Sequence, residues 1–90
     1  MEISDVRIRL VNKGDNKLKA VASITIDKCF VVHDIKIIEA NNDAFIAMPS
    51  RKTNDGEYKD IAHPLDTATR DILKKAILTA YYDELDKSQN

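Results

Sequence analysis

The sequence predicts an α+β fold: an antiparallel sheet of four or five strands, followed by a C-terminal helix that packs on one face of the sheet. Two observations lead to this prediction. Apolar and polar residues alternate through much of the first half of the chain, which is the pattern of half-buried strands. From Asp66 onward the apolar residues instead recur with a period of about 3.6, which is that of an amphipathic helix.

The first two predicted strands form a hairpin. Residues 3–11 alternate, with Arg7 and Arg9 on the polar side, and residues 17–27 alternate in the same way. Residues 12–16 lie between these segments and have the composition of a turn. The side chains expected to face the core are Val6, Ile8, Leu10, Leu18, Ala20, Ala22, Ile24 and Ile26.

The third predicted strand, residues 29–39, has an ambiguous phase because its apolar residues fall on both odd and even positions. A β-bulge near His33 and Asp34 would produce this pattern, and so would burial of the strand on both faces. The sequence leaves both explanations open. A turn at residues 41–43 then leads into a fourth strand over residues 44–48.

Pro49 is expected to end the fourth strand, because proline cannot donate a ladder hydrogen bond. The sequence predicts a loop over residues 50–56, in which Gly56 takes a positive φ after Asn54 and Asp55. Residues 57–62 are a candidate for a short fifth strand.

The helix is predicted to begin at Asp66 or Thr67, either of which can cap its first turn, and to fade near Leu85. Because 90 residues leave no room for a second core, we expect one domain over residues 1–85 and a polar tail over residues 86–90. The predicted apolar stripe of the helix consists of Ile72, Leu73, Ala76, Ile77, Ala80 and Tyr81.

The composition excludes several classes of protein. Hydrophobic residues make up 43% and charged residues 32% of the chain, which is typical of a soluble globular protein. The net charge of −1 argues against indiscriminate binding to nucleic acid. No apolar run approaches the roughly 18 residues of a membrane span, and no signal peptide is evident, so we expect a cytoplasmic protein without membrane contact. The single cysteine, Cys29, excludes an internal disulfide, and we expect it to be buried.

The sequence contains no catalytic or metal-binding constellation. In a strand, Cys29 and His33 would lie about 13 Å apart, which is too far for both to bind one metal ion. His33 and Asp34 would point to opposite faces, and Asp60 and His63 straddle a strand end, where a hydrogen bond within the turn is the commoner arrangement. We therefore predict no enzymatic activity, no cofactor, no metal and no small-molecule substrate.

Basic residues give the strongest functional signal. Arg51 and Lys52 are adjacent in the predicted loop, where cationic side chains can reach phosphates. Arg70 and Lys74 share a face of the helix, and the free N–H groups at the start of the helix also favour phosphate. Lys59 lies nearby if the short fifth strand folds back. The sequence therefore predicts a cationic nucleic-acid-binding rim of Arg51, Lys52, Arg70, Lys74 and Lys75.

A second basic set lies on the outer face of the first hairpin and consists of Arg7, Arg9, Lys17 and Lys19. Pairing across the turn is expected to bring Arg9 close to Lys19. Like charges opposite each other destabilise a sheet, which favours an anionic partner at this face. An exposed sheet face also contains Lys and Arg for solubility alone, so the sequence does not decide the role of this set.

The chain also resembles a known family, the SpoVG family (stage V sporulation protein G) of small bacterial regulators. The similarity is clearest in Phe45-Ile46-Ala47-Met48-Pro49-Ser50-Arg51-Lys52-Thr53, in Asp55-Gly56-Glu57-Tyr58 and in Asp60-Ile61-Ala62-His63-Pro64. It extends over residues 1–82, including Met1-Glu2-Ile3-Ser4-Asp5-Val6-Arg7-Ile8-Arg9 and Thr69-Arg70.

The resemblance implies a dimeric, non-enzymatic regulator of septation or sporulation-type gene expression that binds DNA or RNA at selected sequences. It assigns binding to Arg51 and Lys52, which match the basic pair of the family, and to Arg70, which matches its helix start. Lys74 and Lys75 rest on the charge pattern alone. The alternative is a protein-interaction module that acts in cell division without touching nucleic acid. A homodimer is also favoured by the small core and by the apolar third strand.

Overall fold

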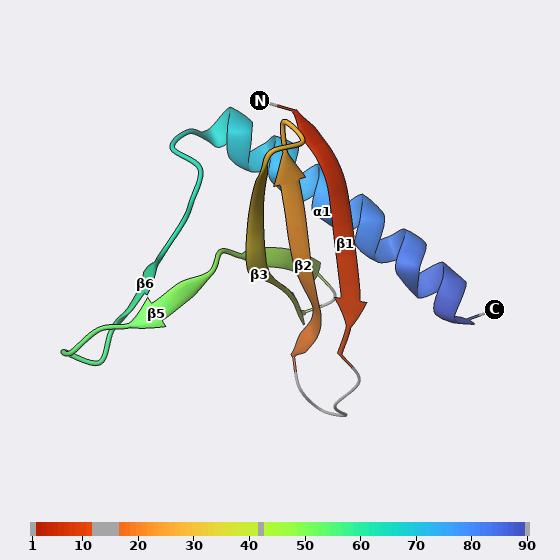
Figure 1. The fold of residues 1–90 in the computed structure, drawn as a ribbon. Helices are drawn as coiled ribbons and strands as arrows, with labels where there is room; N and C mark the ends of the chain where they lie inside the picture. The colour runs from red at the N-terminus through yellow and green to blue at the C-terminus, as the bar shows by residue number, and fades with distance from the viewer. Residues whose placement is uncertain (1, 12–16, 42, 90) are drawn as a thin grey trace.

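The structure, a computed structural model, describes residues 2–11, 17–41 and 43–89. It confirms the predicted α+β arrangement: a four-stranded antiparallel sheet in the order β1-β2-β3-β4, a separate two-stranded sheet β5-β6, and one C-terminal helix (Figure 1). The elements are β1 (Ile3–Leu10), β2 (Leu18–Ile26), β3 (Phe30–Ala40), β4 (Asp43–Ala47), β5 (Ser50–Lys52), β6 (Tyr58–Asp60) and α1 (Thr67–Gln89). The predicted turn at residues 12–16 lies outside the described residues.

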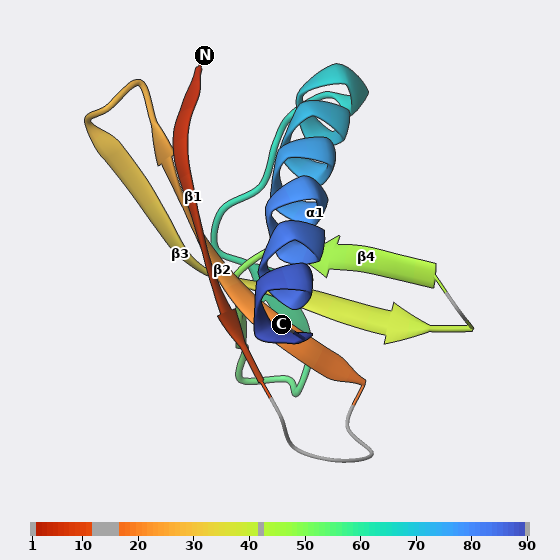
Figure 2. The same cartoon turned by 90° about the vertical axis from the view of Figure 1, so that its right-hand side faces the viewer.

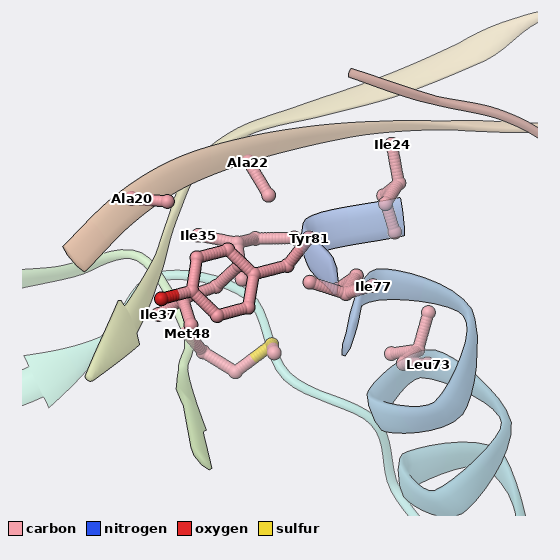
Figure 3. Packing of buried hydrophobic residues seen from close by; sticks show 9 residues of the cluster. All are labelled: Ala20, Ala22, Ile24, Ile35, Ile37, Met48, Leu73, Ile77 and Tyr81. Atoms are coloured by element: carbon pink, nitrogen blue, oxygen red, sulfur yellow. The ribbon is translucent and has the colours of Figure 1, made fainter. Parts of the chain in front are cut away.

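Helix α1 covers one face of the four-stranded sheet and leaves the other face open (Figure 2). The core lies between the helix and the covered face. It consists of Ala20, Ala22, Ile24, Ile35, Ile37, Met48, Leu73, Ile77 and Tyr81 (Figure 3). The predicted inward series of β1 and β2 is confirmed, because Ala20, Ala22 and Ile24 are buried and the even-numbered apolar residues of β1 pack against them.

A β-bulge in β3 explains the ambiguous phase of that strand. Where β2 has one residue, Ser23, the opposing stretch of β3 has two, His33 and Asp34. Asp34 has a φ of 64°, a left-handed conformation that Asp tolerates better than most residues. The extra residue shifts the alternation by one, so the inward-facing positions change from even at Val32 to odd at Ile35. The bulge, rather than burial on both faces, therefore accounts for the mixed pattern.

The prediction of a loop over residues 50–56 is wrong, because residues 50–52 form β5, which pairs with β6 and places Arg51 opposite Lys59. β4 ends at Ala47, two residues before Pro49, and Pro49 does not prevent the new pairing, because only its carbonyl takes part in it. The N–H of Ile61 donates to the Pro49 carbonyl at 2.7 Å and closes the base of the hairpin. The predicted positive φ of Gly56, at 86°, is confirmed in the turn at its tip.

Helix α1 begins where the sequence predicts and ends later. The N–H of Thr69 donates to the Asp66 carboxylate at 2.6 Å, which is an N-cap, and hydrogen bonding from Thr69 lowers the pKa of Asp66. The helix continues to Gln89 rather than fading near Leu85. The residues after Leu85 include neither Gly nor Pro, and the Ser88 hydroxyl donates back to the Leu85 carbonyl at 3.0 Å. The division between a domain and a tail at residue 85 stays a prediction.

The expectation that Cys29 is buried is wrong. The chain reverses between β2 and β3 at Asp27 and Lys28, whose φ values are 51° and 61°. This is the backbone of a tight hairpin turn, in which the Cys29 N–H donates to the Ile26 carbonyl at 3.1 Å. Cys29 therefore lies in the turn and is exposed rather than being part of the strand.

Candidate nucleic-acid interface

The β5–β6 hairpin extends away from the four-stranded sheet (Figure 1), and its two short strands are exposed throughout. Arg51 lies opposite Lys59, and Lys52 lies opposite Tyr58. Because neighbouring strand residues point to opposite faces, Arg51 and Lys59 share one face of this ribbon and Lys52 and Tyr58 share the other. Each face therefore presents positive charge to solvent. The expectation that Lys59 lies near Arg51 and Lys52 is confirmed.

The turn at the tip of the hairpin has its own hydrogen bonds. The Thr53 N–H donates to the Glu57 carbonyl at 2.7 Å, and the Gly56 N–H donates to the Thr53 carbonyl at 3.0 Å. The Thr53 hydroxyl also donates to the Asp55 carboxylate, and this bond is the main reason that the pKa of Asp55 lies below its ordinary value. The hairpin is thus closed at its tip and at its base, so the basic pair is presented on an ordered ribbon.

The three predicted binding residues of the helix are in a different part of the molecule. Arg70, Lys74 and Lys75 are exposed on the N-terminal half of α1. Figure 1 shows the hairpin well separated from this half of the helix, with the segment before residue 67 running between them. The single chain therefore does not join Arg51 and Lys52 with the helix cations in one continuous rim.

The open face of the sheet contains the second basic set. The register places Val21 opposite Arg9. Lys19 lies two residues further along the ladder, opposite Val11, where its carbonyl accepts a hydrogen bond from the Val11 N–H at 2.9 Å. Arg9 and Lys19 are therefore diagonal neighbours on the same face of the sheet, as their expected closeness requires, but they are not directly opposed. Arg7 is paired with Asp5 at 3.1 Å on the same face.

Sequence reasoning missed Lys36, which lies on the open face beside Val21. Its orientation follows from the bulge at His33 and Asp34, and no local pattern in the sequence fixes that orientation. Tyr58 was also given no role, yet it is 72% exposed on the hairpin. An exposed aromatic ring next to a lysine is a surface on which a base can stack.

The structure offers little for other chemistry. Within the described ranges, no three His, Cys, Asp or Glu side chains lie together in a way that could bind a metal ion. His63 Nδ1 lies 3.0 Å from the Pro64 carbonyl oxygen, so this ring nitrogen contacts the neighbouring backbone. None of the described helical residues forms a segment long and apolar enough to cross a membrane.

Comparison with known proteins gives a consistent family. The family model described as SpoVG matches residues 1–83. Three relatives share the name "Putative septation protein SpoVG". The protein from Lachnospira eligens is 62% identical over 81 residues, which cover 90% of this chain and 91% of the relative. The protein from Clostridium acetobutylicum is 60% identical over 81 residues, covering 90% and 84%. The protein from Clostridium perfringens strain SM101 is 58% identical over 90 residues, covering 100% and 94%.

Proposed function

Because this chain belongs to the SpoVG family, we propose that it is a cytoplasmic, non-enzymatic regulator of septation or sporulation-type gene expression that binds DNA site-selectively as a homodimer. The names of the relatives support the link to septation. The observation that most supports DNA binding is the exposed β5–β6 hairpin, with Arg51 opposite Lys59 and with Lys52 on its other face.

A two-stranded ribbon has the right dimensions for the major groove of B-DNA, which is about 12 Å wide. One face of the hairpin would turn Arg51 and Lys59 towards the DNA. An arginine in this groove can donate two hydrogen bonds to a guanine, which provides sequence selection, while lysines neutralise phosphates. The deep, narrow major groove of an RNA duplex would not admit the ribbon, so we propose double-stranded DNA as the ligand and treat RNA as an outcome of the test.

Two further basic surfaces, outside the hairpin, are candidates for contact with other phosphates of the DNA. The first is the helix set, Arg70, Lys74 and Lys75, and the second is the open face of the sheet. The net charge of −1 means that binding depends on such local surfaces rather than on an overall positive field. Binding should therefore weaken steeply as salt is added.

The double substitution Arg51→Ala/Lys52→Ala should weaken binding to a selected duplex by about 10- to 100-fold. It should also lower the slope of log Kd against log salt by about 1 to 2, because each cation that is lost from a phosphate lowers the slope by about 1. Fluorescence anisotropy across a salt series, with duplex and single-stranded RNA probes, measures both quantities.

A matched control for the hairpin substitution removes two positive charges elsewhere. Lys28 has a φ of 61°, so Lys28→Gly is compatible with its backbone, and Lys87 lies in the last turn of α1. The Lys28→Gly/Lys87→Ala variant should bind within about twofold of the parent. If the Arg51/Lys52 variant binds as tightly as the parent, the hairpin is not the binding site. If the parent binds RNA in preference to DNA, RNA replaces DNA as the proposed ligand.

The second candidate function is a protein-interaction module. Exposed apolar side chains favour it: Phe30 is 62% exposed and Leu65 is 92% exposed. An open apolar hollow of about 210 Å³ lies between β2, β3 and the start of α1, with Phe30, Met48 and Leu73 among its lining residues. Affinity purification with and without nuclease separates the two functions, since partners that survive nuclease treatment favour the protein module.

The homodimer is a separate prediction. The exposed apolar side chains on β3 and β4, Val31 and Phe45, are 47% and 43% exposed in the single chain, and a second copy would remove such surface from water. A chain of this size also gains stability from association, because its own core is small. Light scattering at micromolar concentration should give the mass of two chains, and the mass of one chain would contradict the prediction.

A further inference from the structure

We propose that DNA bound at the β5–β6 hairpin continues onto the open face of the four-stranded sheet, where Arg9 and Lys36 bind its phosphates. This inference rests on the proposed function and adds a second contact surface to it. It assigns the neighbouring phosphates to the sheet and not to the cations of the helix. Three features of the structure lead to this assignment: the sheet register, a connected series of hollows, and the balance of charge along them.

The register places Arg9 and Lys36 in one row across the sheet. Arg9 lies opposite Val21 on β2, and Val21 lies opposite Lys36 on β3. Directly opposed residues point to the same face, so both cations project from the open face with the short Val21 between them. Two strand spacings separate their Cα atoms, which is about 10 Å. The long, flexible stems of Arg and Lys can therefore reach different phosphates of one DNA strand.

Connected hollows link this row to the hairpin. A hollow of about 480 Å³ on the open face shares Arg9, Val21 and Asp34 with a second hollow of about 230 Å³. The second hollow is also lined by Lys36 and by Ile61 at the base of the hairpin.

The same Ile61 lines a third hollow, of about 380 Å³, together with Arg51 and Lys59. The hollow on the sheet face therefore adjoins the hollow on the cationic face of the hairpin at Ile61, and together they form one concave surface for the ligand. A ligand that touches Arg51 or Lys59 lies beside the row of Arg9 and Lys36.

The charge along this concave surface is positive. Its cations are Arg7, Arg9, Lys36, Arg51 and Lys59, and its acidic residues are Asp34 and Asp60. Arg7 is the one cation of the five with an ion pair inside the described ranges, to Asp5. The charges of Arg9 and Lys36 are therefore available to a ligand, in a chain whose net charge is −1.

The helix cannot serve the same DNA segment, because it lies on the other side of the sheet. Figure 2 shows α1 against the covered face, with the sheet between it and the open face. Arg70, Lys74 and Lys75 would therefore be separated by the thickness of the protein from DNA that lies on Arg9 and Lys36. A DNA segment that contacts the open face of the sheet therefore cannot also contact the helix cations of the same chain.

The test compares two variants with the same loss of charge: Arg9→Gln/Lys36→Gln on the sheet and Lys74→Gln/Lys75→Gln on the helix. We expect the sheet variant to bind a selected duplex with flanking sequence roughly tenfold more weakly and to lower the salt slope by about 2. The helix variant should remain within about twofold of the parent. Binding of the sheet variant equal to that of the parent, or an equal loss in the helix variant, would overturn the inference. Thermal unfolding confirms that each variant is folded.

The same series separates this inference from the proposed function. If the hairpin variant Arg51→Ala/Lys52→Ala loses affinity and the sheet variant does not, the hairpin site stands and the sheet contact is wrong. If all variants bind like the parent, none of these surfaces is the binding site; if the parent itself binds no duplex, the proposed function is wrong.

A gain of affinity provides an independent test. Asp34 is the acidic residue that lines both hollows of the open face, and it should repel phosphate there. Asp34→Asn keeps the size of the side chain and suits the φ of 64°, because Asn also tolerates the left-handed region. We expect this variant to bind the flanked duplex roughly two- to fivefold more tightly. Unchanged or weaker binding would count against a phosphate path over the open face.

Discussion

Replacing Tyr81 with alanine should lower the free energy of unfolding by about 3–5 kcal/mol, which is the range for deleting a buried aromatic side chain. Tyr81 is the largest of the fully buried side chains and is only 1% exposed. Its ring projects from α1 into the core among Ile35, Met48 and Ile77 (Figure 3). The substitution removes this packing and leaves a cavity at the contact between helix and sheet. Urea unfolding, followed by circular dichroism at one protein concentration, measures the loss.

The next residue in the chain provides the control for this substitution. Tyr82 has the same side chain on the same helix, but it is 52% exposed, and its ring centroid lies 5.2 Å from that of Tyr81. Tyr82→Ala should cost less than about 1 kcal/mol, because little surface returns to water. Equal losses in the two variants would show that the helix is not packed as described.

The hydroxyl of Tyr81 contributes separately from its ring. It donates a hydrogen bond to the Glu39 carboxylate at 2.8 Å, which ties α1 to β3. Tyr81→Phe keeps the ring and removes this bond, so we expect a smaller loss of about 1–2 kcal/mol.

Burial, together with the hydrogen bond and the charge of Glu39, raises the pKa of Tyr81 above its ordinary value of about 10. The unfolded chain therefore loses this proton first as pH rises. The stability that Tyr81 contributes is fully present below pH 10 and decreases above it. The difference in stability between the parent and Tyr81→Phe should accordingly narrow in alkaline solution.

The sequence was sufficient for the parts of the fold that depend on local alternation. The apolar series at Ala20, Ala22 and Ile24 predicted which face of β2 is buried, because successive strand residues must point to opposite sides. It was not sufficient for β3. A bulge and a strand buried on both faces give the same apolar pattern, and only the backbone at Asp34, with its positive φ, distinguishes them.

The candidate interface, too, was predicted from the sequence only in part. Arg51 and Lys52 were identified from the sequence because they are adjacent basic residues in a motif of the family. Their placement on a strand was missed, because β5 exists only through its pairing with β6 across a turn. The place of Lys36 beside Arg9 was missed for another reason. It requires the sheet register and the position of the bulge, and a charge pattern read along one strand contains neither.

On the helix, the 3.6-residue period identified the buried side but not its width. Ile72 and Ile77 both belong to the predicted stripe, and the structure separates them: Ile77 is fully buried, whereas Ile72 is 53% exposed. A helix that crosses a twisted sheet contacts it along a narrow line, so residues at the margin of the stripe extend past the sheet. Which margin is exposed depends on the angle of crossing, and the sequence of the helix does not contain this angle.

Paired substitutions test the difference in burial between Ile77 and Ile72, which have identical side chains. Ile77→Ala should lower the free energy of unfolding by about 2–5 kcal/mol, because it opens a cavity next to Leu73 and Tyr81. Ile72→Ala should cost less than about 1 kcal/mol and leave the slope of the urea transition unchanged, since its side chain is already half in water. Both substitutions remove the same atoms and gain the same helix propensity, so the difference between them measures burial alone. A loss at Ile72 as large as the loss at Ile77 would mean that this margin of the helix is covered in solution.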